Sequence, residues 1–160
     1  MGLTRRSTLG FLCGAVSVLV FHQGALALLR AAGLTTRAPF SMQPTSPLGV
    51  PLVLSLAFWG GLWGILLVTT DRRLPRRGAS VLTGALFGAL APTLVAWFVV
   101  APLKDQPLAA GGDPRAMLTG VLVNAAWGAG AALLLLLAHR LQDGADGREV
   151  SSRSPAGGGP

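Results

Sequence analysis

Apolar residues follow one another along this chain in four long stretches, each of about 20 residues without a charged side chain. The stretches cover residues 8–29, 50–69, 79–101 and 117–138. Because an α-helix rises about 1.5 Å per residue, about 20 residues match the ~30 Å hydrocarbon core of a bilayer. Helices also pair their backbone polar groups internally, as lipid requires. The pattern therefore predicts an all-α fold, a polytopic bundle of four transmembrane helices.

The composition agrees with this prediction. Hydrophobic residues make up 51% of the 160 residues, charged residues 12%, and the mean hydropathy is +0.59. A soluble domain of this size could not bury so much apolar surface, so the excess is expected to face lipid. We predict one membrane domain over residues 1–141 and a disordered tail over residues 142–160, which are rich in glycine, serine and charge.

The net charge of +7 is explained by membrane topology and does not indicate nucleic acid, because the basic residues cluster at segment ends without interleaved aromatic residues. Nine of them fall on one predicted side: Arg5, Arg6, Arg72, Arg73, Arg76, Arg77, Arg140, Arg148 and Arg153. Four fall on the other: Arg30, Arg37, Lys104 and Arg115. The positive-inside rule then places both termini, the loop 71–77 and the tail in the cytoplasm.

The N-terminus also resembles a secretory signal peptide. Arg5 and Arg6 precede the apolar run 9–21, and Ala25-Leu26-Ala27 follows it. His22-Gln23 interrupts the expected cleavage region, and a multispanning protein can keep its first helix as a signal anchor. We expect the first span to be retained, with cleavage as the alternative.

The two halves of the chain share several features. A pair of arginines precedes two glycines spaced four apart in each half, and a Trp-Gly pair precedes a later arginine by the same interval in each. The residues are Arg5-Arg6, Gly10, Gly14, Trp59-Gly60 and Arg72 in the first half, and Arg76-Arg77, Gly84, Gly88, Trp127-Gly128 and Arg140 in the second. This pattern predicts two tandem helical-hairpin repeats in parallel orientation. The alternative is chance recurrence in a glycine-rich chain.

Small residues spaced four apart lie on one face of three predicted helices. They are Gly10 and Gly14, which Ser17 extends by about a turn, then Gly60 and Gly64, and Gly84 and Gly88. Such rows let helix backbones approach closely, so we predict that these glycines pack helices, within one chain rather than between subunits.

Polar residues inside the spans are the candidates for function, since each must find a partner or water. The sequence has no Asp, Glu, Lys or Arg there, but it has His22-Gln23 in the first stretch and Asn124 in the fourth. Counting along the helices places them about 10 Å below the outer boundary. Trp59 and the helix-kinking Pro92 lie near that depth, so the five residues are candidates for one ligand-binding layer or polar network.

Two interpretations of this layer stay open. His22 and Gln23 either bond across helices to Asn124, Ser55 or Thr93 and specify the bundle, or they form a proton relay or pH gate.

We predict no metal or cofactor. His139 is far in depth from His22, and the single cysteine, Cys13, cannot form an intrachain disulfide. The sequence also shows no pattern of catalytic residues, which argues against an enzyme.

The outer connection between the first two stretches, residues 31–49, mixes prolines with apolar side chains. It contains Pro39, Pro44, Pro47, Phe40, Met42 and Leu48. These side chains could cap the bundle or lie in the membrane interface, and a plain ordered connection is the third possibility.

Three segments resemble small four-span bacterial inner-membrane proteins, a group with no established function. They are Phe21-His22-Gln23-Gly24, Pro39-Phe40-Ser41-Met42-x-Pro44 and the glycine- and tryptophan-rich run 58–64. The resemblance implies a bacterial inner membrane and no catalytic residues. We expect a structural or accessory protein that contacts the lipid bilayer and assembles as a homo-oligomer or in a larger membrane complex. The alternative is a channel or carrier for a small solute or proton that uses the polar layer.

Overall fold

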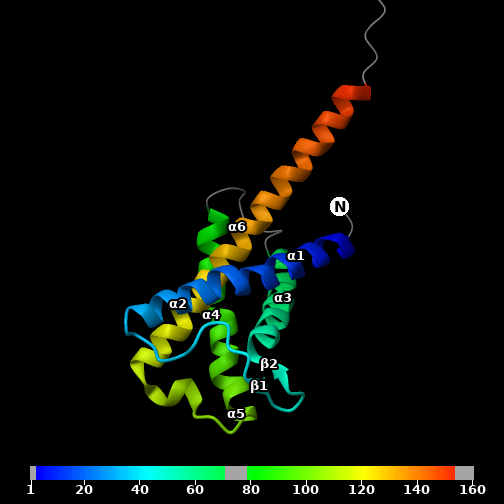
Figure 1. The fold of residues 1–160 in the computed structure, drawn as a ribbon. Helices are drawn as coiled ribbons and strands as arrows, with labels where there is room; N and C mark the ends of the chain where they lie inside the picture. The colour runs from blue at the N-terminus through cyan, green and yellow to red at the C-terminus, as the bar shows by residue number, and fades with distance from the viewer. Residues whose placement is uncertain (1–2, 71–78, 154–160) are drawn as a thin grey trace, which may run out of the picture.

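The computed structural model describes residues 3–70 and 79–153, and most of this chain is helical (Figure 1). The first half holds α1 (Leu3–Ser17), the π-helical turn η1 (Val18–His22), α2 (Gln23–Ala31), the short strands β1 (Pro44–Thr45) and β2 (Val50–Pro51), and α3 (Leu52–Thr70). The second half holds α4 (Ala79–Val95), the π-helical turn η3 (Ala96–Val100), α5 (Ala101–Leu103), the 3-10 turn η4 (Leu108–Gly112) and α6 (Pro114–Arg153).

Four helical segments are long and apolar enough to cross a membrane, which confirms the predicted fold class. They are Leu3–Ala31, Leu52–Thr69, Ser80–Leu103 and Pro114–Gln142. The first continues from α1 through η1 into α2, and the third from α4 through η3 into α5. The chain is therefore a multi-pass α-helical bundle.

The bundle consists of two antiparallel helix pairs, α1 with α3 and α4 with α6, which meet at glycines. In the first pair a Cβ added to Gly10 would lie 2.7 Å from the carbonyl oxygen of Gly64, and one added to Gly14 would overlap the oxygen of Gly60. In the second pair Gly84 faces the carbonyl of Gly128 in the same way, and Gly88 faces that of Asn124. In each of these contacts at least one partner is a glycine, and its missing Cβ lets the backbones approach this closely.

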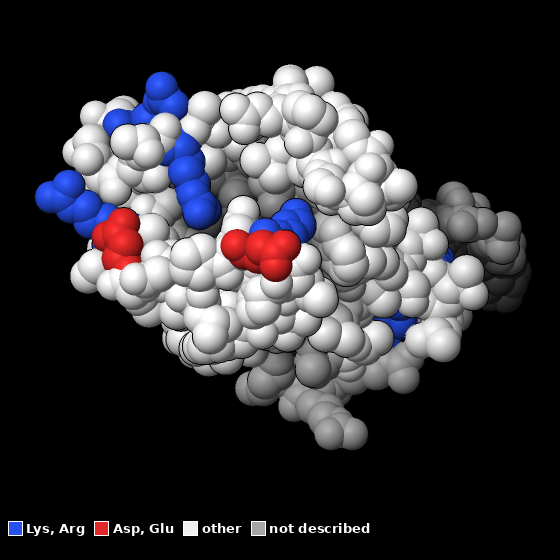
Figure 2. Space-filling model, turned by 90° about the horizontal axis from the view of Figure 1, so that it is seen from below, with Lys and Arg blue, Asp and Glu red and all other residues white. Residues whose placement is uncertain are grey.

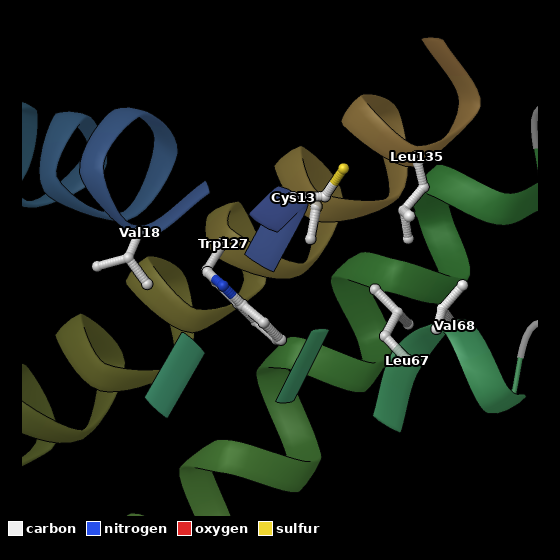
Figure 3. Packing of buried hydrophobic residues seen from close by; sticks show 7 residues of the cluster. Cys13, Val18, Leu67, Val68, Trp127 and Leu135 are labelled. Carbon is white, nitrogen blue, oxygen red and sulfur yellow. The ribbon is translucent and has the colours of Figure 1, made fainter. Parts of the chain in front are cut away.

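The core lies where these pairs meet (Figure 3). Its buried side chains come from α1, η1, α3 and α6 and comprise Cys13, Val18, Leu67, Val68, Trp127, Ala131 and Leu135. The indole of Trp127 lies among them and also packs against Phe87 of α4, with ring centroids 6.4 Å apart. All four spans thus contribute to one packed centre.

Local signals define the helix ends that face the outer connections. Gly33, with φ 71°, ends α2, and the N–H of Leu34 donates to the carbonyl of Leu29 at 2.9 Å, as in a Schellman motif. At the start of α6, the Asp113 carboxylate accepts a hydrogen bond from the N–H of Arg115 at 3.0 Å, and Pro114 occupies the first helical position.

The tail that the sequence predicts to be disordered begins at residue 142, within the range of α6. α6 continues as a helix to Arg153 and extends beyond the bundle (Figure 1). Adding residues to an existing helix avoids the nucleation step, and the first proline of the tail comes only at Pro155. The predicted loop 71–77 and the last residues of the tail, 154–160, lie outside the described residues.

Candidate functional site

Gln23 is 1% exposed and holds the outer connection onto the bundle. Its side-chain Oε1 accepts a hydrogen bond from the backbone N–H of Phe40 at 2.8 Å, across 17 residues of sequence. Phe40 has φ 52°, a conformation that bulky residues rarely adopt, so the connection bends sharply where it reaches Gln23. The glutamine therefore anchors a loop to the helix that precedes it.

His22 is half-buried beside Gln23. Its Nδ1 lies 3.5 Å from Nε2 of Gln23, at the long limit of a hydrogen bond. The backbone here belongs to η1, where each helical hydrogen bond spans one residue more than in an α-helix, and such π-helical turns often occur at functional sites. His22 is thus the more accessible member of the two neighbouring polar residues.

Asn124 belongs to a second polar network, between α6 and α4. Its Nδ2 donates to Oγ1 of the buried Thr93 at 2.9 Å, and that hydroxyl lies 3.4 Å from the carbonyl oxygen of Gly88. Pro92 has no N–H to offer Gly88, so Thr93 supplies the missing donor from the next position. The proline is thereby linked to the neighbouring helix through one threonine and one asparagine.

The predicted layer is therefore divided between two hydrogen-bond networks. One joins His22 and Gln23 to the outer loop, and the other joins Asn124 to Thr93. Trp59 belongs to neither network. Its side chain is 57% exposed, and its ring packs edge-on against the exposed Phe58 of α3, with ring centroids 5.9 Å apart.

The buried indole donor of the bundle is Trp127, which the sequence pattern indicates only as part of the repeat. Its Nε1 donates to the carbonyl of Gly14 at 2.9 Å, and Oγ of Ser17 donates back to the carbonyl of Trp127 at 2.6 Å. We call this reciprocal pair of hydrogen bonds between α1 and α6 the Trp127–Ser17 clasp. Figure 3 shows the indole of Trp127 with its nitrogen at the end of the ring nearer to Val18.

One signal in the sequence could have identified Trp127. It lies near the middle of the span Pro114–Gln142, far from both membrane interfaces where tryptophans usually gather. At that depth water cannot accept from the indole N–H, so a partner inside the protein is required. Trp59 also lies near the middle of its span, Leu52–Thr69, so this signal selects both tryptophans and the exposure of their side chains distinguishes them.

A cavity of about 20 Å³ lies between α3, α4 and α6, close to the opposite end of the spans from the outer loops. His139, Ser80 and Thr83 give it polar walls. This volume is the size of one water molecule and too small for an organic solute.

The face of the molecule seen in Figure 2, from below the view of Figure 1, carries both signs of charge on a mostly uncharged surface. Within the described residues, no group of three or more His, Cys, Asp or Glu side chains is placed to hold a metal ion. Comparison with protein-family models, curated proteins and solved structures gives no significant match.

Chemically, the described polar groups are suited to holding helices and loops together. Every buried side-chain nitrogen or oxygen atom among them has a hydrogen-bond partner. For Gln23, Ser17 and Trp127 the partner is a backbone carbonyl or amide of another segment. Such bonds fix the relative position of segments.

Proposed function

We propose that this protein is a structural or accessory component of a membrane complex. The observation that supports the proposal is that Gln23, Asn124, Ser17 and Trp127, polar residues of the spans, are engaged in bonds between segments of the same chain. A binding site would instead leave some of these groups directed toward a ligand or water. The polar residues thus serve the fold, and function would come from the surface.

The proposal includes a location and an orientation. The nine-to-four division of lysine and arginine across the spans supports a bacterial inner membrane protein with both termini in the cytoplasm. Its partners would be lipid together with further copies of itself or larger membrane proteins. We propose no enzymatic activity.

A channel or carrier is the second candidate, and a specific observation favours it. The first helix of each half contains a π-helical turn beyond its glycine crossing, η1 in one half and η3 in the other. Such turns can act as hinges, so two hairpins could move against each other around the accessible His22.

Reconstitution into phospholipid vesicles tests the choice between these functions. Vesicles with a trapped pH-sensitive dye would report proton flux, and osmotic swelling would report passage of small neutral solutes. A structural protein should give the same rates as protein-free vesicles. Each preparation should contain protein whose helicity and thermal melting match those of the wild type in detergent.

The histidine variants sharpen this test. His22→Ala removes the candidate relay, and His139→Ala is the matched control at the other end of the spans. Flux that is lost in His22→Ala but kept in His139→Ala, with both variants folded, would overturn the structural proposal and favour transport.

A further inference from the structure

We propose that the β1–β2 hairpin, residues 44–51, inserts its apolar tip into the phospholipid headgroup interface and anchors the outer end of α3. The tip residue Leu48 is 83% exposed, and Met42, just before β1, is 66% exposed. Leaving side chains of this size in water forgoes the free energy of burying them. In Figure 1 the hairpin projects beside the lower end of α3 and does not close over the bundle.

The length of α3 determines the depth of the hairpin. The span Leu52–Thr69 has 18 residues, about 27 Å of helix, which barely matches a hydrocarbon core of about 30 Å. Leu52 must therefore lie at the hydrocarbon boundary. Leu48 is four residues away, so it lies within about 14 Å of Leu52 even in a fully extended chain. The tip is thus confined to the neighbourhood of the headgroups.

The apolar surface of the tip is continuous with the lipid-facing surface of α3. Leu54, Phe58 and Leu62 are exposed along that helix and have lipid as their surroundings in a membrane. The hairpin surface therefore contacts the same lipid, at the level of the headgroups.

The hairpin is rigid enough to act as an anchor. Thr45 Oγ1 donates to the carbonyl of Val50 at 2.8 Å, and the N–H of Gly49 donates to the carbonyl of Thr45 at 2.7 Å. The N–H of Leu52 donates to the carbonyl of Gln43 at 2.9 Å, so hairpin and helix are joined. A preorganised tip loses little conformational entropy when it inserts.

Charge on the same side of the molecule fits a phospholipid surface. The outer connections and the helix turns beside them carry four cations, Arg30, Arg37, Lys104 and Arg115, against two carboxylates, Asp105 and Asp113. An excess of cations beside an apolar tip suits phosphate groups at the membrane surface.

Depth-dependent fluorescence quenching tests the proposal in the full chain. Cys13 is the only cysteine, so a Cys13→Ala background allows a single environment-sensitive dye to be attached at Leu48→Cys. Gln106→Cys, in the exposed second outer connection, is the matched control. The protein is reconstituted in phosphatidylethanolamine–phosphatidylglycerol vesicles that contain a lipid with a nitroxide on its headgroup.

We expect lipid nitroxide to quench the dye at Leu48 several-fold more strongly than the dye at Gln106, and aqueous iodide to show the reverse order. Equal quenching at both positions would overturn the proposal. A dye at Leu48 that is shielded from iodide and from lipid nitroxide, but transfers energy to a second labelled copy, would also overturn it and assign the surface to a dimer.

Discussion

Both helix pairs cross at closely packed glycines, but the residues opposite and beside these glycines differ between the pairs. In α1–α3 the residue opposite Gly14 is Gly60, whereas in α4–α6 the residue opposite Gly88 is Asn124. Gly60 leaves room beside the crossing, and the side chains of Val18 and Trp127 lie there, with the indole Nε1 3.1 Å from the position of an added Cβ. Asn124 instead uses its own side chain to bond Thr93 within the pair.

This difference shows how one packing motif can give two tertiary roles. The first crossing is bonded to a third helix, since the indole of Trp127 in α6 donates to the carbonyl of Gly14 in α1. The corresponding bond of the second pair joins its own two helices, because Asn124 of α6 donates to the hydroxyl of Thr93 in α4. Substitutions at the crossings, at the clasp and at Asn124 should therefore change the free energy of unfolding by different amounts and should affect different helices.

The largest effect is expected from closing the first crossing with Gly14→Leu. A Cβ at this position would overlap the carbonyl of Gly60, and both atoms of the collision belong to helix backbones or lie next to them. Overpacking of this kind destabilises by about 3 kcal/mol or more when the backbone must move. The free energy of unfolding in detergent micelles, followed by circular dichroism, measures the loss.

Gly24→Leu is the matched control for this prediction. It lies in the same span, and an added Cβ would have no atom within 4 Å. Its effect should stay within about 0.5 kcal/mol, as for other substitutions away from packed contacts. Equal effects of the two leucines would mean that the close crossing of α1 and α3 does not exist.

An intermediate effect is expected from Trp127→Phe, which keeps an aromatic ring in the core but removes the indole N–H. Loss of a buried interhelical hydrogen bond costs about 1–2 kcal/mol. Hydrogen exchange should also become faster in α1, because the clasp joins α1 to α6.

Trp59→Phe provides the comparison for the tryptophan, since that side chain is largely exposed. Its free energy of unfolding should be nearly that of the wild type. If both tryptophan substitutions have the same small effect, the first pair does not depend on the third helix.

The sequence predicts the fold because span length and the lack of charge are properties of consecutive residues. It does not predict which polar residues meet, because that depends on the rotation of each helix about its axis. The long spans are apolar on nearly every face, so helical periodicity does not identify the inward face. Asn124 and Gln23 can therefore share a depth and still belong to different networks.

The repeat illustrates the same limit. The sequence pattern aligns Trp59-Gly60 with Trp127-Gly128, but the crossings make Gly64 and Gly128 equivalent, since they face Gly10 and Gly84. The tryptophan that corresponds to Trp127 is then Trp63. Spacing along the chain cannot distinguish these two alignments, one helical turn apart, whereas backbone contacts can.

The smallest effect is expected from Asn124→Ala, which removes the side-chain bond of the second pair and keeps its backbone crossing. Hydrogen bonds of this kind in membrane proteins contribute about 0.6 kcal/mol on average and up to about 1.7 kcal/mol. A double-mutant cycle with Thr93→Val should recover a coupling energy of that size, since the two side chains bond each other.

Pairing Asn124→Ala with Thr119→Val should give no coupling, because the Thr119 hydroxyl bonds the Arg115 carbonyl of its own helix. Coupling that is absent from both cycles would show that the second pair is held by its glycines alone, and the contrast between the two pairs would reduce to the Trp127–Ser17 clasp.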